Sequence, residues 1–201
     1  MRRREIAAIA ERAFLESGFA ATTMQTIAER AGASKETLYR HFANKEALFA
    51  EIVRARSARF LGPDGEAPTG APAIVLARLG ERALDTLFDP ESVDLFRVVV
   101  AEAPRTPELG AIFYDQGPGR VLRELAHYLR SADAQAQLRC NEPEQAAELL
   151  LGAVLGPFHL RRVTAPGAAP PDAPARCAHV GAAIAMFLAR YGAAGSGPTA
   201  A

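Results

Sequence analysis

The 201-residue chain is 49% hydrophobic, which is enough to bury the core of one small and one larger domain and argues against a disordered protein. Its formal net charge is zero, but the charge is unevenly distributed. Residues 1–60 carry nine Arg and two Lys against seven Glu, a net charge of +4, and the remaining residues carry twelve Arg against sixteen acids, a net charge of −4. The positive charge that suits a polyanionic partner therefore lies in the N-terminal part.

The two cysteines, Cys140 and Cys177, are too few for a disulfide framework and lack zinc-finger spacing, which favours a reducing compartment. The basic start of the chain is not followed by the apolar stretch of a signal peptide, and the longest uncharged stretches, 149–160 and 177–189, are too short to span a membrane. We expect a cytoplasmic protein without membrane association. The residues suggest no cofactor and no metal site, because the His and Cys residues do not follow a usual ligand spacing.

Four short helices are predicted within the first 60 residues from apolar residues at three- and four-residue spacing. The first begins near Ile6 and ends at Gly18, a left-handed cap that places Phe19 against Phe14. Thr22 is expected to open the second helix in a capping box with Gln25, and Gly32 to end it. The third and fourth helices are expected to be capped at their N-termini by Ser34 and Asn44.

The rest of the chain also reads as helical, with no strand-like alternation. Gly and Pro between Gly62 and Pro72 predict a linker or long loop, and a second Pro-rich loop spans 166–174. Prolines and breakers delimit the expected helices, which are 73–88, 90–103, 107–116, 118–131, 143–163 and 175–191. Pro157 lies inside one of them and can kink it.

The predicted fold is therefore all-α. We expect an N-terminal three-helix DNA-binding domain with a helix-turn-helix at residues 1–50, linked through the fourth helix to about residue 61. A larger antiparallel helical domain for ligand binding and dimerisation is expected at 51–192, and a disordered tail at 193–201.

Two short capped helices joined by the tight turn at 31–34 are typical of a helix-turn-helix, although ordinary helical hairpins share this spacing. The chemistry of the third helix favours DNA binding, because the residues off its Leu38 and Phe42 stripe can bond phosphates or bases. Free N–H groups at the helix starts suit phosphate oxygens. The predicted DNA-binding residues are Thr22, Thr23, Gln25, Ser34, Lys35, Thr37, Tyr39, Arg40, His41 and Lys45. Arg54, Arg56 and Arg59 are expected to form a solvated helix face instead.

Residues 14–19 (FLESGF), 22–28 (TTMQTIA) and 31–49 (AGASKETLYRHFANKEALF) resemble the DNA-binding domain of the TetR family of repressors. The likeness covers roughly residues 4–53. Ala33, where the family often has Val, and Ala43-Asn44, where Ser is frequent, are mild departures. The resemblance implies a homodimeric DNA-binding transcriptional regulator.

Residues 96–104, 107–109 and 113–118 are similar to the AefR-like C-terminal domain of one branch of that family. The resemblance implies that helices 143–163 and 175–191 pair with those of a second copy as a four-helix bundle. Small residues on these helices permit a close approach, namely Gly152, Ala153, Gly156, Gly181 and Ala185.

We therefore expect a ligand-responsive repressor that binds a pseudo-palindromic operator on double-stranded DNA as a dimer and is released by a small-molecule effector, best matched by an apolar or amphipathic compound. Candidate pocket residues, which are also typical of a plain core, are Phe88, Phe96, Phe113, Tyr114 and Phe158.

Three alternatives stay open at this point. A regulator of the same fold can activate transcription or respond to a protein partner. An adaptor without DNA binding is disfavoured because the basic and hydroxyl residues of the third helix are present. A helical enzyme is disfavoured because the sequence has no Gly-rich phosphate loop, nucleophile elbow or HExxH motif.

Overall fold

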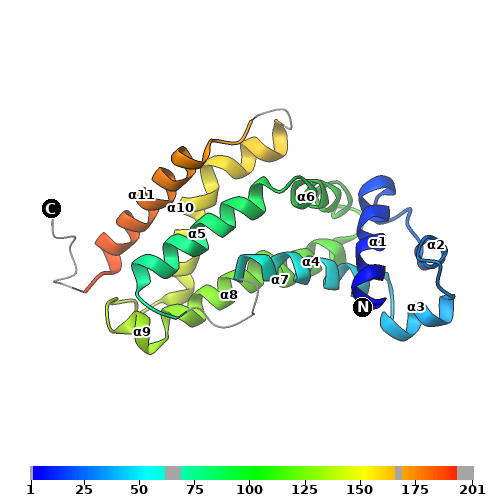
Figure 1. The fold of residues 1–201 in the computed structure, drawn as a ribbon, viewed down its shortest axis with the longest axis horizontal. Coiled ribbons are helices and arrows are strands. Elements are labelled where there is room, and N and C mark those ends of the chain that lie inside the picture. The colour runs from blue at the N-terminus through cyan, green and yellow to red at the C-terminus, as the bar shows by residue number, and fades with distance from the viewer. Residues whose placement is uncertain (1, 62–68, 166–168, 194–201) are drawn as a thin grey trace. The chain divides into compact units, whose positions relative to one another are not determined.

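The computed structural model describes residues 2–61, 69–165 and 169–193, and these residues form helices with no strand beyond one isolated bridge between Leu138 and Gly192 (Figure 1). The predicted all-α fold with an N-terminal helix-turn-helix is confirmed. The helices are α1 (Arg2–Ser17), α2 (Met24–Arg30), α3 (Lys35–His41), α4 (Lys45–Leu61), α5 (Pro72–Phe88), α6 (Pro90–Glu102), α7 (Pro107–Gln116), α8 (Pro118–Leu129), α9 (Ala132–Gln135), α10 (Pro143–Thr164) and α11 (Ala173–Tyr191).

Most of the predicted helix ends in the N-terminal part are confirmed. Gly18 is left-handed, with φ of 82°, and the rings of Phe14 and Phe19 lie 5.2 Å apart. The Ser34 hydroxyl accepts a hydrogen bond from the backbone N–H of Thr37 at 3.1 Å, and the Asn44 side chain accepts one from that of Ala47 at 2.7 Å.

The cap predicted for α2 is wrong by one residue. Thr23, not Thr22, caps this helix and accepts a hydrogen bond from the N–H of Thr26 at 3.1 Å. The Thr22 hydroxyl instead donates to the carbonyl of Gly18 at 2.7 Å and is buried. Two adjacent threonines offer the same capping group, so burial of the first one decides which of them caps.

The later helices agree with the prediction to within two residues at each end, because a proline stands at or next to the start of each. One was missed: α9 is a single turn capped by Ser131, too short for an apolar periodicity. The predicted linker and tail fall largely on residues 62–68 and 194–201, which lie outside the described residues.

By contacts the chain divides into two compact units, and the division falls inside α4 and α8. Unit 1 comprises Met1–Ser57 and Pro90–Arg120, and unit 2 comprises Ala58–Asp89 and Val121–Ala201. Residues 90–120, which the sequence assigned to the C-terminal domain, thus group with the N-terminal helices. The domain limits 1–50 and 51–192 stay a prediction.

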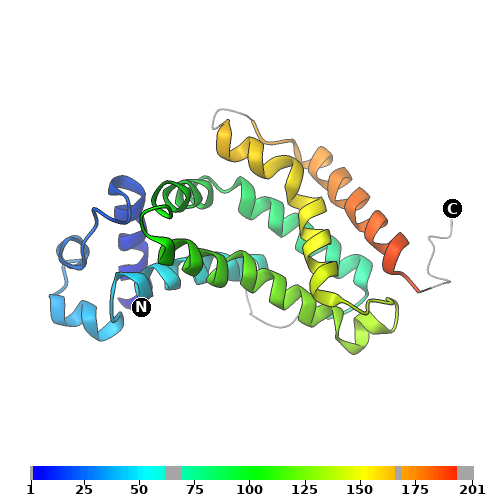
Figure 2. The same ribbon diagram turned by 180° about the vertical axis from the view of Figure 1, so that it is seen from behind.

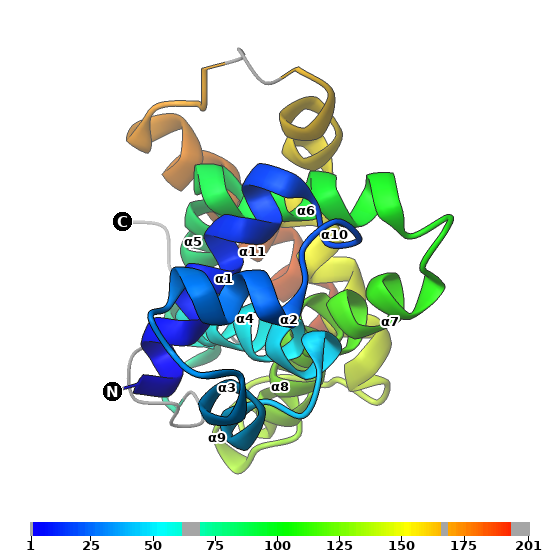
Figure 3. The ribbon, with the colours of Figure 1, turned by 90° about the vertical axis from the view of Figure 1, so that its right-hand side faces the viewer.

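In unit 1, α1 packs against α2 and α6 (Figure 3). The rings of Phe14, Phe19 and Phe49 form an aromatic cluster with centroid distances of 5.2 to 6.1 Å, which joins α1, the turn after it and α4. Leu95 and Val99 of α6 complete this core. Burial of such side chains holds the small helices together, because helices of seven residues are not stable alone.

In unit 2, α5 packs against both α10 and α11 (Figure 1). Gly80 of α5 permits the close approach, since a Cβ atom there would lie 2.8 Å from a methyl carbon of Val180 on α11. Helix α10 continues through Pro157 and bends along its length (Figure 2). The bend is expected of a proline, which lacks the N–H of the helical ladder and clashes with the preceding turn.

Candidate nucleic-acid interface

The turn between α2 and α3 is built from a left-handed glycine. Gly32 has φ of 54°, and the N–H of Ala33 donates to the carbonyl of Ala28 at 3.0 Å, which closes α2. Ser34 then starts α3 at once. The two helices and this turn form the predicted helix-turn-helix.

Helix α3 has one buried and one exposed side. Leu38 is fully buried and Phe42, just after the helix, is 2% exposed. Lys35, Tyr39 and Arg40 are exposed, with Tyr39 44% exposed. A phenol so exposed beside two cations is not part of the core, so this side of α3 is free to contact an outside partner.

The remaining predicted residues of α3 and its cap are partly engaged within the helix. The hydroxyls of Ser34 and Thr37 lie 2.9 Å apart, and both side chains sit at the N-terminal end, where backbone N–H groups are free. Thr37 and His41 are half-buried. The site therefore offers two hydroxyls at one end of α3 and a histidine at the other.

On α2 the predicted residues differ in their access. Thr23 and Gln25 are exposed, and the Gln25 amide donates to the carboxylate of Glu29 at 2.7 Å. Thr22 is 2% exposed, so its side chain is part of the core between α1 and α2.

Lys45 points inward. Its ammonium donates to the carbonyls of Phe19 at 2.6 Å and Thr22 at 2.9 Å, and it lies 4.3 Å from the centre of the Phe19 ring. Burial lowers the pKa of this ammonium, while the carboxylates of Glu46 and Glu102 act in the opposite direction. In this position Lys45 stabilises the turn between α1 and α2.

Two arginines at the start of α1 were not singled out by the sequence reasoning. Arg2 donates to the carbonyls of Ala31 and Gly32 at 3.3 and 3.2 Å, and Arg3 donates to that of His41 at 2.5 Å. Each therefore binds the C-terminal end of one helix of the helix-turn-helix, where free carbonyls attract a cation. Only the basic composition of the segment hinted at them.

The expectation that Arg56 belongs to a solvated face is wrong. This residue is 7% exposed and its guanidinium binds Glu11, the hydroxyl of Ser92 at 2.9 Å and the carboxylate of Glu91 at 2.8 Å. It links α1, α4 and α6 within unit 1. Arg54 and Arg59 are exposed, as predicted.

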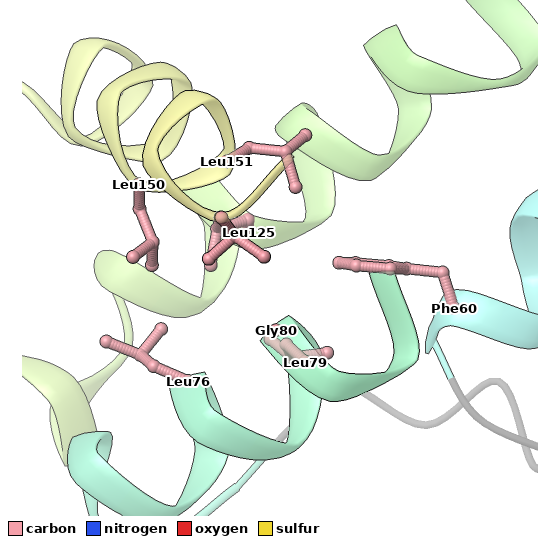
Figure 4. A pocket seen from close by; sticks show the side chains of 8 residues that line it. Phe60, Leu76, Leu79, Gly80, Leu125, Leu150 and Leu151 are labelled. Carbon is pink, nitrogen blue, oxygen red and sulfur yellow. The ribbon is translucent and has the colours of Figure 1, made fainter. Parts of the chain in front are cut away.

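Unit 2 contains an apolar cavity with about 210 Å³ of empty space (Figure 4). In Figure 4 the Phe60 ring and leucines from three helices point toward one another around it. It is lined by Phe60, Leu76, Leu79, Gly80, Leu125, Leu150, Leu151 and Val154.

None of the five predicted pocket aromatics lines this cavity. Phe96 and Phe113 pack against each other in unit 1, with ring centres 5.5 Å apart, and Tyr114 is 58% exposed. Phe88 and Phe158 pack edge to face in unit 2 at 5.7 Å. Aromatic spacing along the sequence does not distinguish a cavity wall from ordinary core packing.

Two family profiles match the chain. Residues 6–52 match the tetR family of bacterial regulatory proteins, and residues 74–193 match the C-terminal domain of AefR-like transcriptional repressors. The chain belongs to the TetR family. This TetR-family protein is a DNA-binding transcriptional regulator and not an enzyme.

Individual relatives agree with the family. The regulator is 30% identical to the HTH-type transcriptional repressor AcnR of Corynebacterium efficiens, over 81% of this chain and 82% of AcnR. A TetR-family regulator from Mesorhizobium loti has a TM-score of 0.77 at 30% identity, covering 96% of this chain and 97% of that one. The flavonoid-responsive regulator FrrA has a TM-score of 0.76 at 30% identity, covering 99% and 98%.

Helices α10 and α11 of the regulator expose apolar side chains. Leu149, Leu160 and Met186 are 58%, 72% and 61% exposed. A Cβ atom added at Gly152, Gly156 or Gly181 would meet nothing within 4 Å. Among the described residues, no helix is long and apolar enough to cross a membrane, and no three potential metal ligands gather.

Proposed function

We propose that the regulator represses transcription by binding a pseudo-palindromic operator as a dimer, with α3 of each subunit in a major groove, and that a small molecule releases it. The observation that carries this proposal is the exposed side of α3, with Lys35, Tyr39 and Arg40 opposite the buried Leu38. Family dimers use a two-fold axis, which selects two related half-sites.

We assign the residues of this surface by their chemistry. Lys35 supplies a charge for a phosphate, and Tyr39, Arg40 and Thr37 reach bases or backbone. Contacts to phosphates come from the helix starts and from the flanking polar residues, namely Thr22, Thr23, Gln25, Ser34, His41 and Lys45. For Thr22 and Lys45, whose side chains are engaged inside unit 1, the role is to support the turn before α2.

We propose dimerisation through the helices at 143–163 and 175–191. The exposed apolar side chains of α10 and α11 support this assignment, as do the glycines that leave room for a second backbone. Apolar surface of this kind is usually covered in a stable protein.

The apolar cavity of unit 2 is the proposed effector site. All its lining side chains are apolar, so it selects an apolar or amphipathic molecule. Its 210 Å³ falls below the roughly 300–1,000 Å³ of typical ligand pockets. An effector must therefore widen it, and a molecule that binds only the widened state shifts the protein toward that state. The likeness to FrrA makes flavonoids the first compounds to try.

The test uses fluorescence anisotropy with a DNA duplex selected from a random pool by the unmodified protein. We expect saturable binding that weakens with salt, with a slope near −0.9 per phosphate contacted. Lys35→Ala should weaken binding and reduce the magnitude of that slope by about 0.9, and Tyr39→Ala should weaken binding without changing it.

Arg78→Ala is the matched control, because Arg78 is an exposed cation on α5, in unit 2. Its affinity and slope should equal those of the unmodified protein. Equal binding by all three variants would show that α3 is not the reader, and failure to select any duplex would contradict operator binding itself. The same assay then tests release of the DNA by flavonoids.

A further inference from the structure

The turn that connects α1 to α2 receives a carboxylate from α6. Gly18 adopts a left-handed conformation, after which the N–H groups of Phe19 and Ala20 point the same way. They donate to the two carboxylate oxygens of Glu102, each at 2.7 Å. Successive backbone N–H groups in such a turn form an anion-binding concavity, and Glu102 fills it.

The opposite side of the same turn is held by a cation. Lys45 donates to the carbonyls of Phe19 and Thr22, as described above. The five-residue turn thus has its N–H groups bound by an anion from α6 and its carbonyls bound by a cation from α4. We call Glu102 and Lys45 together the turn clamp.

Local preferences do not explain the position of Glu102. It is the last residue of α6, where the helix dipole and the free carbonyls disfavour a negative charge. A carboxylate at a helix C-terminus needs compensation from elsewhere, and here the two N–H groups and the nearby Lys45 supply it. The residue therefore serves a contact between elements rather than its own helix.

The turn determines where the helix-turn-helix begins. Thr23 caps α2 only three residues after Ala20, and α3 follows α2 through another short turn. A change in the direction of residues 18–22 would therefore be carried to both helices. Hydrogen bonds to a charged group contribute about 1.5–3 kcal/mol each, enough to select one direction of the turn.

We propose that Glu102 is a positioning residue for operator binding: its carboxylate fixes the turn at residues 18–22 and thereby the orientation of α2 and α3 against DNA. It contacts no base or phosphate itself. The proposal gives α6 a specific chemical hold on the helix-turn-helix.

The decisive variant is Glu102→Gln, because two opposite results are expected from two explanations. Removal of a negative charge from a DNA-binding unit strengthens binding if only long-range electrostatics matters. If Glu102 positions the turn, binding weakens, because a glutamine has one acceptor oxygen and its amide N–H₂ faces a second donor. We expect about tenfold weaker binding to the selected duplex, with the salt slope unchanged because no phosphate contact is lost.

Glu102→Asp keeps the charge but is one methylene shorter, so it should restore part of the affinity. Glu108→Gln is the matched control, since Glu108 is an exposed carboxylate on α7 in the same unit. It should bind as the unmodified protein does. Binding by Glu102→Gln that equals or exceeds that of the unmodified protein would overturn the proposal, as would a change of slope near 0.9.

Amide hydrogen exchange provides a readout that needs no DNA. In the unmodified protein the amides of Phe19 and Ala20 should exchange slowly, although Ala20 is exposed, because both are bonded to Glu102. They should exchange faster in Glu102→Asp and Glu102→Gln. Fast exchange of both amides in the unmodified protein would refute the clamp even if a variant fails to fold.

Discussion

Gly18 and Gly32 have the same backbone requirement in different surroundings. Both have positive φ, 82° and 54°, which side chains other than that of glycine rarely adopt. A Cβ atom at Gly18 would lie 2.5 Å from a carboxylate oxygen of Glu102, whereas one at Gly32 would meet nothing within 4 Å. The two positions therefore separate backbone strain from steric conflict.

We predict that Gly32→Ala costs about 1–2 kcal/mol of unfolding free energy, from the left-handed conformation alone. Gly18→Ala should cost at least about 1 kcal/mol more, because the added methyl also displaces the Glu102 carboxylate. Urea denaturation of the two variants and the unmodified protein measures the difference.

DNA binding supplies the second comparison between these variants. Gly18→Ala should weaken it in the same way as Glu102→Gln, with the salt slope retained. Equal stability losses for the two glycine variants would contradict the close contact between Gly18 and Glu102.

At this scale the sequence predicts groups whose partners are a few residues away. Gly18, Ser34 and Asn44 could be assigned from it because a cap or a left-handed turn is a local event. Arg56 and Glu102 could not, because the partners that bury or bind them lie between 35 and 83 residues away along the chain. Their roles depend on the packing of α6 against α1.

The helices as elements were easier to predict than their contacts. Prolines at the starts of α5, α6, α7, α8 and α10 mark these helices because proline fixes φ and needs no hydrogen-bond acceptor at the first turn. The contact between α5 and α11 has no comparable signal. It depends on Gly80, which in the sequence reads only as a weak point in a helix.

We predict that Gly80→Ala destabilises the protein by about 1–3 kcal/mol, because its methyl would lie 2.8 Å from Val180. Val180→Ala alone leaves a cavity and costs a similar amount. In the double variant the smaller residue makes room for the new methyl, so the loss should be clearly less than the sum of the two. Thermal or urea unfolding of the four proteins completes this double-mutant cycle.

Additive losses in that cycle would mean that the two residues do not share a contact. Leu138→Val, a conservative change in the same core cluster at a residue that does not touch Gly80 in the close-contact set, is the additive control with Gly80→Ala.

The whole molecule acts as a dimer, as its family does. The proposed dimer face on α10 and α11 contains Leu149, Leu160 and Met186 among its exposed apolar side chains. A stable interface usually buries about 1,200–2,000 Å² in total, which two helices from each subunit can supply.

We predict that Met186→Lys lowers the dimer affinity strongly, because a lysine at the centre of the interface would lose its hydration without an acid to pair with. Sedimentation velocity should then show monomers at concentrations where the unmodified protein is dimeric. DNA binding should weaken as well, because a monomer contacts one half-site.

Ile74→Lys is the matched control for this change. Ile74 is 68% exposed on α5, so the same charge is added to the same unit outside the proposed face. It should remain dimeric. A dimeric Met186→Lys protein would exclude the centre of α11 from the interface.

The seven residues of α3 limit how much sequence one subunit can read. A helix of this length spans about 10 Å, or roughly three steps of the DNA duplex. A word of three base pairs, even doubled by the second subunit, recurs by chance many times in a bacterial chromosome. Much of the information that singles out one promoter must therefore come from the bending and groove width of the DNA around and between the half-sites.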